Sequence, residues 1–68
     1  MDEEKLNIQV RKFLKKVGIQ SQREIEQAVK DRIKKGTLSV TENLEATMLL
    51  EVPGIDLKVS IDGKIEIE

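Results

Sequence analysis

The sequence predicts an α+β fold: a two-helix hairpin packed on a small antiparallel sheet, in the order α-α-β-β-β. Three observations lead to this fold class. Apolar residues recur at helical spacing over residues 6–17 and 25–33, they alternate with polar residues from residue 44 onward, and glycines separate these runs. At 68 residues the chain has room for a single small domain, with a helical half, 1–36, and a strand half, 37–68.

The first predicted helix begins at Asp2 or at Asn7, because both residue types are favourable N-caps. Ile8 lies off its apolar side. The residues that share this side follow helical spacing: Leu6, Val10, Phe13, Leu14 and Val17. Phe13 is the only aromatic residue of the chain, and we expect it to be buried between the helices and the sheet.

A corner is predicted between the two helices. Gly18 can adopt the left-handed conformation that often follows a helix, and Ser21 with Glu24 has the spacing of a capping box. About three residues would then join the helices, so that they pack as a hairpin or as a helix-turn-helix corner. The second helix is expected over residues 22–35, and Gly36 ends it.

The segment over residues 44–52 permits two interpretations. Its apolar and polar residues alternate, and only Leu49 breaks the alternation, which indicates a strand. Its Glu, Leu, Ala and Met residues instead favour a helix, which Ser39 and Glu42 could cap. We prefer the strand, because the period of the pattern is more informative than the propensities, and the helix remains the alternative.

The Pro-Gly pair at residues 53–54 predicts a turn after this strand. If Val52 pairs with Ile55, Leu50 lies opposite Leu57, and the apolar residues of both strands share one face.

Residues 62–64, Asp-Gly-Lys, predict a second turn. A three-residue loop there would pair Ile61 with Ile65 and Val59 with Ile67. The sequence therefore predicts a third strand after residue 64.

Several short motifs carry a resemblance to a known family. They are Arg-Lys-Phe-Leu at residues 11–14, Val-Gly at 17–18 and Ser-Gln-Arg-Glu-Ile-Glu at 21–26, with Val-Pro-Gly at 52–54. With these motifs the chain resembles a family of short bacterial proteins known only as a domain of unknown function, over nearly its whole length. The resemblance implies a small bacterial protein, and it carries over no activity and no site.

The composition argues against catalysis. The chain has no histidine and no cysteine, so the usual base at neutral pH, the thiol nucleophile and the common zinc ligands are all missing. The serines at 21, 39 and 60 have no evident activating partner, and no loop has the clustered carboxylates of a calcium site. We predict that the protein is not an enzyme and has no catalytic residue, cofactor or metal.

Charge is divided unequally between the halves. Residues 1–36 hold ten Lys/Arg and six Asp/Glu, a net +4, and residues 37–68 hold two Lys and seven Asp/Glu, a net −5. Phosphate binding requires a positive surface, and two helices followed by a hairpin is the order of a winged helix-turn-helix domain. Glu51 and Asp56 at the hairpin tip would repel phosphates, however. The candidate basic surface consists of Arg11, Lys12, Lys15, Lys16, Arg23, Lys30 and Lys34.

The most economical interpretation is a non-enzymatic small interaction domain whose partner is itself or an unknown protein. A chain of this size buries only about 60% of its unfolded surface, and without cysteine it must gain stability by packing or by oligomerisation. The alternative, which we disfavour, is a winged-helix-like nucleic-acid-binding protein. No apolar run approaches the roughly 20 residues that span a bilayer, and the acidic N-terminus lacks a signal-peptide pattern, so we expect a cytoplasmic protein without a membrane partner.

Overall fold

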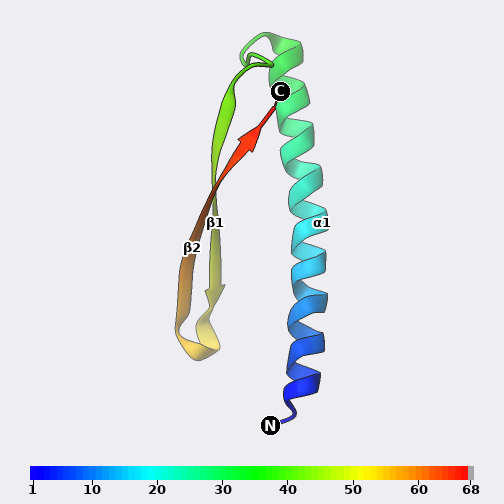
Figure 1. Ribbon diagram of the computed structural model, residues 1–68, viewed down its shortest axis with the longest axis vertical. Helices are drawn as coiled ribbons and strands as arrows, with labels where there is room; N and C mark the ends of the chain where they lie inside the picture. The colour runs from blue at the N-terminus through cyan, green and yellow to red at the C-terminus, as the bar shows by residue number, and fades with distance from the viewer. Residues whose placement is uncertain (68) are drawn as a thin grey trace. The chain divides into compact units, whose positions relative to one another are not determined.

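The computed structural model describes residues 1–67, which form one long helix followed by a β-hairpin (Figure 1). The elements, in order, are the helix α1 (Glu3–Lys35), the strand β1 (Asn43–Val52), the 3-10 turn η1 (Pro53–Ile55) and the strand β2 (Leu57–Glu66). The chain divides into two compact units, Met1–Thr37 and a second unit that begins at Leu38.

The predicted arrangement of two helices and three strands is wrong. One helix takes the place of the predicted helical hairpin, and β1 and β2 form a two-stranded antiparallel sheet within the described residues. The prediction fails at two places: the chain has no corner near Gly18 and no turn at residues 62–64.

The helix α1 continues without a break through the expected corner, as its ribbon shows in Figure 1. Gly18 and Ser21 both lie inside it, so Gly18 is not a helix end and Ser21 is not an N-cap. Glycine inside a helix costs about 1 kcal/mol relative to alanine. A corner would instead leave the last carbonyls of one helix and the first N–H groups of the next without helical partners. Keeping one glycine inside a continuous helix therefore costs less free energy than breaking the helix at Gly18.

The two ends of α1 agree with the sequence. The Asp2 side chain caps the N-terminus, where its Oδ1 accepts a hydrogen bond of 3.0 Å from the Lys5 backbone N–H; this selects Asp2 over Asn7. Gly36 has a φ of 77° at the C-terminus. The N–H of Gly36 donates to the carbonyl of Ile33 at 3.1 Å, and that of Thr37 to the carbonyl of Arg32 at 2.9 Å. This is a Schellman motif, and it confirms Gly36 as the residue that ends the helix.

The strand interpretation of residues 44–52 is confirmed, with a different register from the predicted one. Val52 pairs with Leu57 rather than with Ile55, and Leu50 pairs with Val59. The turn is longer than expected because η1 is followed by Asp56 in the left-handed conformation, with its N–H donating to the Pro53 carbonyl at 3.1 Å. The register shifts by two residues, so every side chain keeps its predicted face.

The predicted second turn and third strand are absent from the hairpin. Strand β2 continues through residues 62–64. There Asp62 pairs with Thr47, and Gly63 pairs with Ala46. The Thr47 hydroxyl also donates to Asp62 Oδ1 at 3.1 Å. A turn at this position would deprive the first half of β1 of its backbone partners, whereas the continuous strand satisfies them.

No side chain among residues 1–67 is buried. Phe13 is 55% exposed, so the prediction that it fills the core is wrong. The prediction depended on a second helix, and a single helix cannot surround its own side chains. A two-stranded hairpin is likewise marginal in water by itself.

Candidate interaction surfaces

One side of α1 is apolar along most of the helix. We call this surface the α1 stripe: Leu6, Val10, Phe13, Leu14, Val17, Ile25 and Ala28. Its pattern recurs after eleven residues, so that Leu14 corresponds to Ile25 and Val17 to Ala28. Eleven residues complete three helical turns, which keeps the recurring residues on the same side.

The α1 stripe is accessible to solvent. Leu14 is 51% exposed, close to the value of Phe13, and only Val17 and Ala28 are half-buried. Two polar residues interrupt the apolar surface: Ser21 at the position that corresponds to Val10, and Glu24 at the position that corresponds to Phe13. A helix with this pattern normally packs its apolar side against another element.

The hairpin also has one apolar face. Residues directly opposite each other in the ladder lie on the same face, and the apolar pairs are Leu44 with Ile65, Met48 with Ile61, Leu50 with Val59, and Val52 with Leu57. We call these eight residues the hairpin face. The other face pairs opposite charges, Glu45 with Lys64 and Glu51 with Lys58, and it carries Leu49 opposite Ser60.

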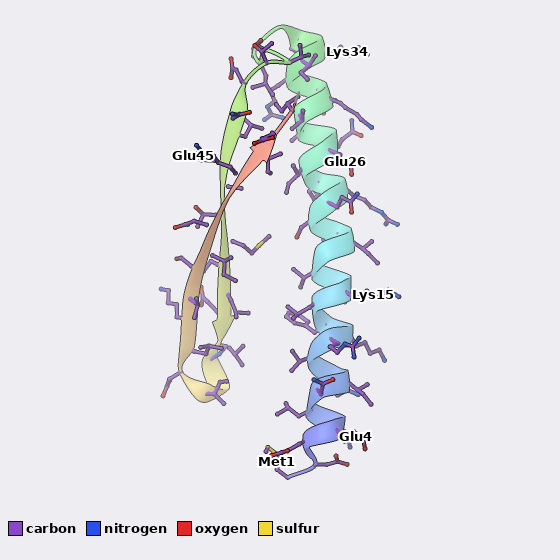
Figure 2. The ribbon with its side chains drawn as sticks, viewed as in Figure 1. Met1, Glu4, Lys15, Glu26, Lys34 and Glu45 are labelled. Atoms are coloured by element: carbon purple, nitrogen blue, oxygen red, sulfur yellow. The ribbon has the colours of Figure 1, made fainter. Side chains whose placement is uncertain are left out.

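All seven residues of the candidate basic surface lie on α1, and all are exposed. Figure 2 shows Lys15 and Lys34 projecting outward from the helix. Five of the seven are separated by four or seven residues, which corresponds to about one or two helical turns. They therefore share one side of α1, the side away from the α1 stripe. These five are Lys12, Lys16, Arg23, Lys30 and Lys34. Lys15 lies beside this basic side, whereas Arg11 lies between it and the α1 stripe, nearer to the stripe.

Lys5 belongs to the same basic side, although it was not among the predicted residues of the candidate basic surface. It precedes Lys12 by seven residues, and this interval would have identified it if the helix had been taken as continuous from its first turn. The basic side is not purely positive. Glu26 lies next to it and accepts a hydrogen bond of 2.7 Å from the side-chain amide of Gln22.

Two hollows on the described residues are open to solvent. A shallow hollow on α1 is lined by Lys12, Lys16, Ile19 and Arg23 among others, and another on the hairpin includes Thr47, Asp62 and Gly63. Over residues 1–67, no group of carboxylates is placed to hold a metal ion. Nor does this part of the chain contain a helix with both the length and the apolar character needed to cross a membrane.

Together these features define a small helix–hairpin protein with an exposed apolar surface on each unit. The Family of unknown function (DUF6494) matches residues 1–68, so the chain belongs to this family. Neither the curated proteins nor the solved structures give a match. The resemblance to a domain of unknown function is thereby confirmed, and the family brings no assigned activity to the chain.

Proposed function

We propose that the protein is a non-enzymatic interaction module that associates with further copies of itself through the α1 stripe. The observation that carries the proposal is the exposure of the stripe in a chain in which none of residues 1–67 is buried. Full burial of one Val, Leu, Ile or Phe side chain contributes about 1.5–3 kcal/mol. Five of the seven stripe residues are exposed, so burying them against a partner would add a large favourable contribution to stability.

The composition supports association because it removes the other sources of stability. Small domains with little core are stabilised by disulfides, by a structural metal or by oligomerisation. The chain has no cysteine for a disulfide, and neither cysteine nor histidine for a zinc site. Packing and oligomerisation are the sources of stability that this composition leaves open. Since none of residues 1–67 is buried, the structure favours oligomerisation, which supports the choice of a second copy as the partner.

The absence of histidine and cysteine also supports the non-enzymatic part of the proposal. A bacterial source and a cytoplasmic location belong to the proposal as well; the resemblance in sequence motifs supports the first and the lack of long apolar runs is compatible with the second.

The test is the molar mass in solution, measured by analytical ultracentrifugation over a wide range of protein concentrations. We expect a mass above the 7.7 kDa of one chain and a Tm that rises with concentration, because association stabilises the folded state by mass action. A protein that stays monomeric at every concentration and melts cooperatively would overturn the proposal.

A matched pair of variants locates the contact. The double change Leu14→Gln and Val17→Gln places two amides on the α1 stripe and should shift the protein toward the monomer. The control Ile8→Gln makes the same kind of change off the stripe, at a side chain that is also exposed, and should leave the mass unchanged. Equal behaviour of the two variants would show that the stripe is not the contact surface.

A further inference from the structure

We infer that two copies pair through their α1 stripes in antiparallel directions. This inference rests on the proposed self-association and adds its geometry. It follows from the charges at the two ends of α1 and from the positions of the stripe residues along the helix.

The ends of α1 carry opposite charges. Glu3 and Glu4 lie in the first turn beside the capping Asp2, and the last turn holds Arg32, Lys34 and Lys35. A parallel pair would bring acidic ends together and basic ends together, which is unfavourable at both ends. An antiparallel pair sets the acidic first turn of each helix beside the basic last turn of the other. Opposite charges then meet at both ends of the interface, which favours this direction and disfavours the other.

Four of the seven stripe residues fit the symmetry of such a pair. Two identical antiparallel helices are related by a twofold axis, which crosses α1 at its midpoint, Ile19, when the helix ends are aligned. Val10 and Ala28 lie equally far from this midpoint, and so do Phe13 and Ile25. The axis therefore places Val10 of one copy level with Ala28 of the other, and Phe13 level with Ile25.

The axis does not pair every apolar residue with another apolar residue. Leu14 lies level with Glu24 and Val17 level with Ser21, so polar side chains lie near the middle of such an interface.

Val10 and Ala28 also share a side of the helix. They are eighteen residues apart, which is five complete turns at 3.6 residues per turn. If Val10 of a helix points toward the partner helix, Ala28 of the same helix therefore does so as well. In a parallel pair, by contrast, each residue would lie level with its own copy.

Cross-linking distinguishes the two directions. The chain contains no cysteine, so the variants Val10→Cys and Ala28→Cys each carry a single thiol. The two variants are unfolded together, refolded as a mixture and treated with a short bis-maleimide. We expect cross-linked dimer in the mixture and only background amounts in either variant alone, because identical positions in an antiparallel pair lie about 27 Å apart.

A control variant, Lys30→Cys, places the thiol on the basic side, two residues from Ala28. Mixed with Val10→Cys it should give background cross-linking, since it faces away from the stripe. Cross-linked dimer from Val10→Cys alone and from Ala28→Cys alone would show a parallel pair and overturn the inference, while self-association would stand.

The molar mass of each cysteine variant is measured before cross-linking. A dimer that gives none of these cross-links has its interface elsewhere, which also overturns the antiparallel pairing. If both the variants and the unchanged protein are monomeric, the proposed self-association fails as well, so the two failures are distinguishable.

Discussion

At the scale of single residues, the glycine inside α1 and the glycine that follows its last residue have different backbone requirements. Gly36 has a φ of 77°, a conformation that L residues other than glycine rarely adopt, whereas Gly18 lies within regular helix. A Cβ built on either residue meets no atom within 4 Å. Backbone conformation, rather than space, therefore decides what each position tolerates.

We expect Gly18→Ala to stabilise the protein and Gly36→Ala to destabilise it. Alanine is about 1 kcal/mol more favourable than glycine inside a helix, whereas the left-handed conformation costs an alanine about 1–2 kcal/mol. Thermal melting followed by circular dichroism at one fixed protein concentration would measure both changes. A lower Tm for Gly18→Ala would indicate that Gly18 is needed for a bend or corner.

The same two residues show how far the sequence could predict the helix. The last apolar residue of the helix lies shortly before Gly36, and the residues after Gly36 show no helical periodicity. The role of Gly36 as a helix end was therefore predictable. Gly18 has a similar local sequence, with lysines before it and a capping-box pattern after it. What identifies it as internal is the recurrence of the stripe eleven residues later, a pattern of the whole helix rather than of the corner.

At the scale of elements, the hairpin shows which local signals the pairing of strands overrides. The alternation from residue 44 onward predicted correctly that this part of the chain is extended and which face each side chain of residues 44–61 takes, but it predicted three strands where the described residues form two. The Asp-Gly pair at residues 62–63 is a frequent turn sequence, yet it lies inside β2, where Asp62 bonds to Thr47. The length of β1, which needs a partner along all ten of its residues, decides the outcome.

The hairpin therefore predicts that Gly63→Val is tolerated or stabilising. Gly63 lies opposite Ala46 in the ladder and has no positive φ, and valine favours extended strands more than glycine does, by up to about 1 kcal/mol. If residues 62–64 instead formed a turn that requires glycine, the variant would be clearly destabilised. Urea unfolding of the two proteins would measure the difference in the free energy of unfolding.

At the scale of the whole molecule, the candidate site was predictable only in part. The basic residues of the helical half were correctly placed on helix, and their common side follows from a single continuous α1. The exposure of Phe13 could not be read from the sequence, because an apolar helix side has the same pattern whether another element covers it or not. The winged-helix arrangement, which was the disfavoured alternative, is excluded, since it requires the corner that α1 lacks.

We expect the protein to bind duplex DNA negligibly at physiological salt, despite its basic side. The test compares the unchanged protein with the triple variant Lys12→Gln, Lys15→Gln and Lys16→Gln by fluorescence anisotropy at several salt concentrations. Binding through phosphate contacts would weaken steeply with salt, because bound lysines release counterions. Sub-micromolar, salt-sensitive binding that the triple variant loses would promote nucleic acid to the favoured partner.

A sheet of only two strands, as the described residues form it, has two free edges. In each strand alternate amide groups point toward the partner strand, and the amides between them point outward without a partner in the ladder. Hydrogen–deuterium exchange should therefore alternate along β1 and β2, slow at one residue and fast at the next. Loss of the fast positions along one strand at high protein concentration would reveal that a further strand has joined that edge.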